Sequence, residues 1–417
     1  MPTFLAPVSY SATAGASNIT VGDFNGDHKD DLAVVNYGVS GVIGILIGNG
    51  DGTFQPEVDY PAGAYPGDAK AADLNGDGVL DLAVSSTTGT VNVLLSNGNG
   101  TFGSPTSYAA NFGAHSIQVG DFNNDGKLDL TTMNSGTASV LLGNGDGTFQ
   151  NHLDASFPGN TNMIVGDFNR DGNLDLATSN TVSVGTITLL KGRGDDSFDP
   201  AINIAAYSAP VYLAAGDFNN DGYVDFAVAN SYAATSMSIV MNNGDGTYAP
   251  PATYNIAQTG YEIEVADFNN DGYQDYAVRG VTQYQVGYGK GDGSFYAAQN
   301  FATPSGQFEK GSQHADFNGD GAIDLAYISS AGLTVVMNAN DSAANLAGAV
   351  GFQVSTPAST TSGSAMPMTI DCLQVEWSGF HFRRSVNGNA ADHVVWQIID
   401  CNHGAFGQDL RALKHVG

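Results

Sequence analysis

The sequence is poor in basic residues and in long apolar runs. It has 13 Lys and Arg against 42 Asp and Glu, which gives a net charge of −29 over 417 residues. A protein that binds the nucleic-acid backbone needs a basic surface, so this balance excludes a simple phosphate-backbone binder. No run of 18 apolar residues is present, and we therefore predict no membrane-spanning segment. The opening MPTFLAPVSYSATAG lacks the basic and apolar regions of a signal peptide, so none is visible in this chain.

Cysteine and helical periodicity are also scarce. The two cysteines, Cys372 and Cys401, lie after residue 370, so the preceding sequence depends neither on disulfides nor on cysteine-based metal sites. No sustained 3.6-residue hydrophobic period appears, and we expect almost no helix. The length suffices for one large closed domain with an appendage.

What the sequence does contain is an acidic hexapeptide in seven copies. The copies begin at residues 23, 73, 121, 167, 217, 267 and 316, and DFNNDG is the commonest form. Around each copy, short alternating apolar runs are separated by Gly, Asn and Asp. In the third unit these runs lie at Ile117 and Val119, from Leu130, at Ala138–Leu142 and from Thr148. Four short strands per repeat of about 48 residues are the expected result.

Seven four-stranded units can bury their faces against one another by closing into a ring, so we predict an all-β fold, a seven-bladed β-propeller, over residues 1–340. A hairpin signal of the type GNGDGTF accompanies six of the repeats. In the seventh repeat the corresponding segment is NANDSAANL (338–346), which lacks this signal. The N-terminal segment PTFLAPVSY (2–10) resembles GTFQPEVDY (52–60). We therefore predict that residues 2–10 supply the outer strand of the last blade.

The remainder of the chain changes in character. Residues 341–370 are rich in Ala, Ser and Thr and indicate a linker or the start of an immunoglobulin-like module. Residues 371–417 hold both Trp and both Cys without clean periodicity, and the pattern assigns them no fold.

The acidic loop has the spacing of a calcium loop. In the third copy, Asp121, Asn123 and Asp125 place oxygen ligands at positions 1, 3 and 5, and Gly126 permits the sharp turn at position 6. Position 7 offers its backbone carbonyl and Asp129 follows at position 9. An all-oxygen donor set favours calcium over zinc or copper. An Asp-rich turn capped by its own side chains could explain one such loop, but seven in the same register favour the metal site.

Two other calcium motifs do not fit. An EF-hand needs Glu at position 12 between helices, but Val84 and Thr132 occupy that position and the flanks are strand-like. Nonapeptide calcium repeats need a period of 9, whereas the period here is near 49.

The repeats resemble the FG-GAP/VCBS family, the calcium-bearing blades of integrin α-subunit propellers and of secreted microbial propellers, over residues 1 to about 340. This resemblance implies about seven Ca²⁺ ions, one per blade. In the first copy His28 replaces Gly and Asp30 replaces Leu or Val, so site one departs from the pattern. The implied ligands are Asp23, Asn25, Asp27, Asp31, Asp73, Asn75, Asp77, Asp81, Asp121, Asn123, Asp125, Asp129, Asp167, Asn169, Asp171, Asp175, Asp217, Asn219, Asp221, Asp225, Asp267, Asn269, Asp271, Asp275, Asp316, Asn318, Asp320 and Asp324.

Function is expected on the face opposite the acidic loops, where integrin-like propellers bind their partners. Candidate ligand contacts just before the first strands are His115, Tyr212, Tyr261 and Glu262. Aromatic residues at such a rim can also simply fill gaps between blades. We expect a secreted, calcium-binding module for adhesion or binding, with a glycan or an extracellular protein as partner. An extracellular or cell-surface location and a monomeric state are expected.

The alternative is an enzyme on the same scaffold. Lys70, Glu264 and His314 are predicted near the central tunnel, where they could act as acid, base or metal neighbours. This hypothesis gives a calcium-dependent lactone or ester hydrolase, or a polysaccharide lyase. No serine nucleophile elbow, HExxH or phosphate loop is present. A structural spacer within a longer surface protein is the third possibility.

Overall fold

The computed structural model describes residues 3–159, 161–181, 185–207, 209–230, 236–280, 282–303, 311–330 and 332–339, together with three short strands after residue 375. Every regular element in these ranges is a β-strand, as the sequence predicted. None of the described residues belongs to a helix long and apolar enough to cross a membrane.

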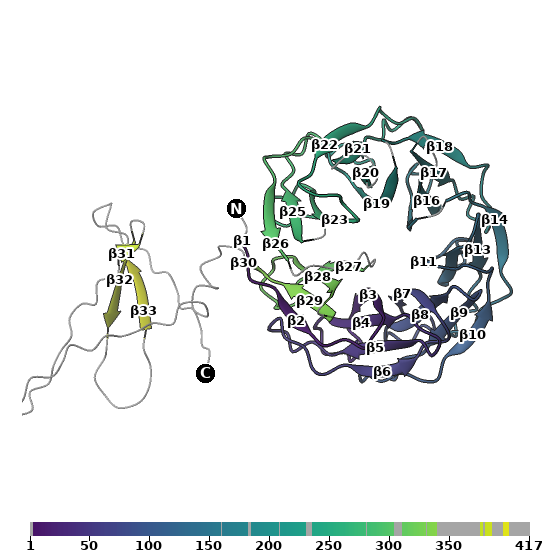
Figure 1. Cartoon of the computed structure of the whole chain (residues 1–417), viewed down its shortest axis with the longest axis horizontal. Coiled ribbons are helices and arrows are strands. Elements are labelled where there is room, and N and C mark those ends of the chain that lie inside the picture. Colours follow the sequence, from purple (N-terminus) through teal and green to yellow (C-terminus); the bar gives the residue numbers. More distant parts are fainter. Residues whose placement is uncertain are drawn as a thin grey trace, which may run out of the picture. The chain divides into compact units, whose positions relative to one another are not determined.

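Seven four-stranded antiparallel sheets form a closed ring, which confirms the predicted seven-bladed propeller (Figure 1). In each blade the first strand faces the central axis and the fourth lies at the outside. The first four blades comprise β3 (Ala16–Gly22), β4 (Asp31–Asn36), β5 (Val42–Leu46) and β6 (Val58–Pro61); β7 (Pro66–Ala72), β8 (Asp81–Ser86), β9 (Thr90–Leu94) and β10 (Thr106–Ala109); β11 (Ser116–Gly120), β12 (Asp129–Met133), β13 (Thr137–Leu141) and β14 (Leu153–Ser156); β15 (Met163–Gly166), β16 (Asp175–Asn180), β17 (Thr186–Leu190) and β18 (Ile202–Ala205). The last three comprise β19 (Pro210–Gly216), β20 (Asp225–Asn230), β21 (Ser236–Val240) and β22 (Ala252–Asn255); β23 (Glu262–Ala266), β24 (Asp275–Arg279), β25 (Gln283–Gly287) and β26 (Gln299–Ala302); β27 (Ser312–Ala315), β28 (Asp324–Ser329), β29 (Gly332–Val336) and β2 (Val8–Tyr10).

The ring is closed by the N-terminus. β2 pairs antiparallel with β29 and is the outer strand of the last blade, as predicted. A second pairing joins β1 (Thr3–Phe4) to β30 (Asn338–Ala339), with Phe4 opposite Asn338. In the first blade the same hairpin contact is an isolated bridge between Gly48 and Phe54. The seventh hairpin is therefore split between the two ends of the propeller.

The fourth strands begin later than the sequence indicated. In the third blade we placed this strand from Thr148, but β14 begins at Leu153. Phe149 instead forms an isolated bridge with Gly143 and ends the hairpin turn. The GDGTF segment is thus a turn that precedes the outer strand.

The core lies between neighbouring blades. Second strands such as β4 and β8 are buried at every residue, because both of their faces meet another blade. The Phe of an acidic loop packs against the hairpin Phe of the following blade, as Phe24 does against Phe102 with ring centroids 5.6 Å apart. Phe4 makes the equivalent contact with Phe268 at 6.2 Å. These contacts explain why Phe recurs in both motifs.

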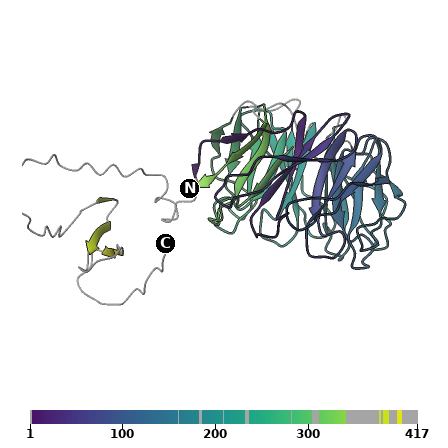
Figure 2. The ribbon, with the colours of Figure 1, turned by 90° about the horizontal axis from the view of Figure 1, so that it is seen from below.

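Seen from the side, the propeller has two faces, one at each end of the strands of its blades (Figure 2). The acidic loops join the first strand to the second, so all seven lie on one face. The opposite face carries the connections from fourth to first strands and from second to third strands.

The chain divides into two compact units, Met1–Val350 and Gly351–Gly417. The second contains an antiparallel sheet of β31 (Glu376–Trp377), β32 (Phe380–Ser385) and β33 (Val395–Ile399). The predicted boundary at residue 340 and the predicted linker 341–370 lie outside the described residues, and no fold was predicted for 371–417.

Candidate functional site

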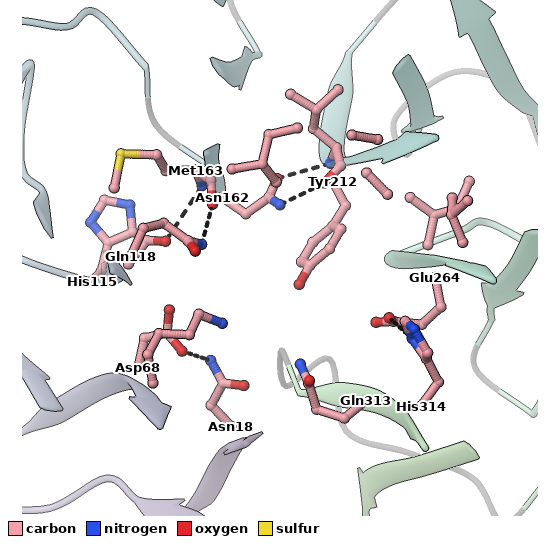
Figure 3. Close-up of a pocket in the computed structure, with 18 residues that line it drawn as sticks. Asn18, Asp68, His115, Gln118, Asn162, Met163, Tyr212, Glu264, Gln313 and His314 are labelled. Carbon is pink, nitrogen blue, oxygen red and sulfur yellow. Dashed lines mark hydrogen bonds and ion pairs between the residues drawn. The ribbon is translucent and has the colours of Figure 1, made fainter. Parts of the chain in front are cut away.

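A cavity of about 220 Å³ lies on the axis of the propeller. All seven inner strands, or the residues just before them, contribute to its lining (Figure 3). Many lining residues belong to the first half of their strands, whereas the acidic loops follow the strand ends. The cavity, which we call the channel, therefore lies toward the face opposite the acidic loops. This face is the one on which the sequence predicted function.

Two of the four predicted rim residues line the channel. Tyr212 directs its phenol into it (Figure 3). Burial raises the pKa of Tyr212 well above its ordinary value, and the negative charges of Glu262 and Glu264 add to this effect, so the phenol stays protonated at neutral pH. His115 also lines the channel, and its Nδ1 donates to the carbonyl of Gly113 at 2.7 Å.

The other two rim residues are placed differently. Glu262 is buried, and its carboxylate lies 3.3 Å from the guanidinium of Arg279. The same carboxylate accepts a hydrogen bond from the backbone of Gly311 at 2.9 Å. Tyr261 donates its backbone N–H to the carbonyl of Arg279. Neither residue is part of the channel lining, and Glu262 joins two blades instead.

All three residues of the enzyme hypothesis line the same channel. Glu264 and His314 form a pair, with Nδ1 of His314 2.9 Å from Oε2 of Glu264 (Figure 3). Burial raises the pKa of Glu264, although its hydrogen bond to His314 acts against this. Burial opposes the protonation of His314, but the hydrogen bond and charge of Glu264 outweigh burial and raise the pKa of His314 above its ordinary value. The ammonium of Lys70 has no hydrogen bond or ion pair with any described residue.

Polar side chains near the strand starts bridge neighbouring blades. The amide of Asn18 donates to Asp68 at 2.7 Å, and Asp68 accepts the backbone N–H of Ile117 at 3.1 Å. Asn162 both accepts from and donates to the backbone of Leu213, each at 2.8 Å. Sequence reasoning did not find these bridges. Their signal is a polar residue five positions before the first Asp of a loop, as in Asn18 and Asp68.

Each acidic loop is folded around its first Asp. In the third loop, Asp121 accepts the backbone N–H groups of Asp125 and Gly126, at 3.0 and 2.8 Å. In the first loop His28 takes the place of Gly126, and its backbone donates to Asp23 at 2.8 Å. Its φ of 62° lies in the left-handed region that glycine favours, so the substitution keeps the loop shape.

The ninth residue of each loop ties the loop to the hairpin of its own blade. Asp31 is fully buried and accepts the backbone N–H groups of Phe24 and Gly48. Burial raises the pKa of Asp31 to about 6, while these two hydrogen bonds act in the opposite direction. Each carboxylate oxygen has more than one acceptor site, so these bonds leave acceptor capacity for a hard cation. Within the described ranges, no three His, Cys, Asp or Glu side chains already enclose a metal position.

A ring of four-stranded blades, each with an acidic loop between its first two strands, defines a class of repeat propeller. The FG-GAP-like repeat matches residues 23–84, 73–132, 121–178, 167–228 and 217–278. These matches span more than half of the chain, and the protein belongs to this repeat family. Among curated proteins, none matches the sequence.

Several solved structures share the fold at low sequence identity. A lectin from Agrocybe aegerita, described as recognising non-reducing terminal N-acetylglucosamine, is 20% identical with a TM-score of 0.53, covering 78% of this chain and 86% of that one. The BP39L lectin from Burkholderia pseudomallei is 13% identical with a TM-score of 0.59, covering 78% and 95%. BBS1N, solved in complex with ARL6DN, is 11% identical with a TM-score of 0.55, covering 80% and 96%. These similarities show the fold.

Proposed function

We propose that the protein is a binding module that takes the end of a glycan into the channel. The observation that carries this proposal is the convergence of hydrogen-bonding side chains from different blades on one cavity. Typical pockets for drug-sized ligands occupy about 300–1,000 Å³, and the channel, at 220 Å³, is smaller. It suits a single terminal sugar unit rather than an internal stretch of polysaccharide. The two lectins with this fold support the same ligand class.

Aromatic side chains on the same face offer further contacts. Tyr37 and Tyr65 stand together with ring centroids 5.3 Å apart. Phe112 is 77% exposed, and Tyr207 is also exposed. Exposed aromatic rings beside hydrogen-bonding groups are typical of ligand sites. We propose that the sugar units following the terminal one lie across these rings. An extracellular protein could use the same face, and it is the second partner class to test.

We further propose that the acidic loops bind calcium and that the protein works outside the cell. Position 1, 3, 5 and 9 side chains and the position 7 carbonyl would hold each ion. Bound Ca²⁺ would offset repulsion within the seven loops in a protein whose net charge is −29. Extracellular calcium modules bind at about 10⁻⁴–10⁻³ M, which suits that location. In this proposal calcium stabilises the blades and does not contact the ligand, because loops and channel lie toward opposite faces.

A glycan array with two matched tryptophan variants tests the proposal. Ala214 lines the channel, so Ala214→Trp should fill it and abolish binding. Ala252 is exposed on the outer strand β22, so Ala252→Trp should bind as the parent protein does. Melting curves will show whether both variants are folded. If Ala214→Trp does not fold, the smaller substitution Ala214→Leu replaces it in the test. Equal binding by both tryptophan variants would place the ligand elsewhere.

The pairing of Glu264 with His314 favours an enzyme as the second candidate function. A carboxylate that orients a histidine is a common arrangement for general-base catalysis. In a lactone or ester hydrolase, or a polysaccharide lyase, His314 would accept the proton and Glu264 would hold the imidazole. Turnover of such substrates that is lost in His314→Ala but unchanged in Lys290→Ala, an exposed site, would support this function. Unchanged turnover in His314→Ala would exclude His314 as the base.

A further inference from the structure

Lys70 differs from the other charged groups of the channel because its side chain has no partner among the described residues. It lies on β7, is half-buried and lines the cavity. No described residue forms a hydrogen bond or an ion pair with its ammonium. An ammonium that is partly removed from water and has no partner is less stable than one that is paired.

The neighbouring charges each have partners. Asp68 accepts hydrogen bonds from the amide of Asn18 and from the backbone of Ile117 and Ala69. Glu264 is paired with His314 at 2.9 Å. Asp68 is satisfied by neutral donors and Glu264 by His314, so Lys70 is the charged side chain among the described lining residues that has neither a hydrogen bond nor an ion pair.

We infer that the channel binds a terminal sugar that carries a carboxylate, and that Lys70 pairs with that carboxylate. This inference rests on the proposed glycan-binding function and names its ligand class. Hydrogen bonds between an ammonium and a carboxylate are about twice as strong as those between neutral groups. The protein as a whole is strongly acidic, but charges more than about 8 Å away are largely screened at physiological salt. Inside the channel the carboxylates of Asp68 and Glu264 already have partners, so the contact with Lys70 is the one that selects the ligand.

The remaining polar groups suit the hydroxyls of a sugar. Gln313 lines the cavity and forms no hydrogen bond with any described residue through its side chain. Gln118 donates its amide to the carbonyl of Met163 at 2.7 Å, which leaves its Oε1 as an acceptor. The carboxylates of Asp68 and Glu264 in the same cavity already have partners. One cation without a partner among the described residues, beside neutral amides, therefore matches a monoanion that has several hydroxyls. A dianionic phosphate would call for more than one cation.

The test is an array of the full chain in calcium and about 150 mM salt, where the Debye length is about 8 Å. The probes are oligosaccharides that end in glucuronic or galacturonic acid, their methyl esters, their neutral counterparts and sulfated counterparts. The acids should bind at least tenfold more tightly than the methyl esters. Lys70→Met should remove that preference, Lys70→Arg should retain part of it, and Lys290→Met should leave it unchanged. Lys290 is the matched control because it is exposed and its loss changes the net charge equally.

The outcomes separate this inference from the proposed function. Equal binding of acids, esters and neutral glycans overturns the carboxylate assignment, while loss of that binding in Ala214→Trp still supports the channel. Preferential binding of the sulfated probes also overturns it. If no glycan binds, or if Ala214→Trp leaves binding unchanged, the proposed function and the inference both fail. The acid-to-ester comparison uses the parent protein, so it holds even if Lys70→Met does not fold.

Discussion

Substitution of Phe4 by Ala should weaken the whole ring. Phe4 is 7% exposed, and its ring lies 4.8 Å from that of Phe301 and 6.2 Å from that of Phe268. Truncation of a buried Phe costs about 3–5 kcal/mol. Leu5 is the adjacent residue and is 49% exposed, so Leu5→Ala should cost about 1 kcal/mol or less. The difference arises because Phe4 replaces the missing seventh hairpin Phe, whereas Leu5 faces solvent.

Urea denaturation followed by far-UV circular dichroism measures this difference. With a slope of about 3 kcal/mol/M, Phe4→Ala should lower the midpoint by about 1–1.7 M, and Leu5→Ala by about 0.3 M. Residues 1–340 contain no tryptophan, because both tryptophans lie after residue 375, so intrinsic tryptophan fluorescence offers no probe within the ring. Deletion of residues 1–10 should destabilise the ring more than deletion of 371–417. Equal midpoints for Phe4→Ala and Leu5→Ala, or equal effects of the two deletions, would refute closure by the N-terminal strand.

Three further predictions concern a bridge between blades, a buried ion pair within the sixth blade and the acidic loops. Asn162→Ala should lower the free energy of unfolding by about 1–3 kcal/mol, because the backbone N–H and C=O of Leu213 both lose their partner. The control Asn97→Ala, at an exposed position, should change it by less than about 0.5 kcal/mol. Arg279→Met should lower the free energy of unfolding by about 3–5 kcal/mol, because it leaves Glu262 charged and buried. The double variant Arg279→Met/Glu262→Gln should recover part of that loss, and no recovery would show that the ion pair is not its cause. Excess EDTA should lower the melting temperature, since each bound Ca²⁺ stabilises the fold by about 1.4 kcal/mol when its concentration is tenfold above Kd. Plasma emission analysis should find about seven Ca²⁺ per chain. Two ions or fewer, or an unchanged melting curve in EDTA, would contradict the assignment of the loops as calcium sites.

The fold could be predicted from the sequence because each repeat contains its own strand and turn signals. Seven loops in register gave the number of blades, and the likeness of residues 2–10 to 52–60 gave the closure. The start of the outer strand was misplaced because a turn with an isolated bridge at Phe149 has the same residue preferences as a strand. His28 could not be assessed from sequence, since only the backbone shows that it takes the left-handed conformation.

The candidate site was only partly predictable. Register with the loops placed Lys70, Glu264 and His314 on the inner strands, and all three line the channel. The role of Glu262 could not be seen, because its partner Arg279 lies on another strand and both are buried. Which charge lacks a partner depends on contacts between residues of different blades that are far apart in sequence, as in the hydrogen bond that the backbone N–H of Ile117 donates to Asp68. Those contacts carry no local signal.

The most direct test of the channel as the binding site is a crystal structure of the full chain with calcium and the tightest glycan from the array. The account predicts density for the terminal sugar inside the channel, on the face opposite the acidic loops, with its carboxylate against the ammonium of Lys70. A sugar bound on the outer strands or on the loop face, with only water in the channel, would contradict it.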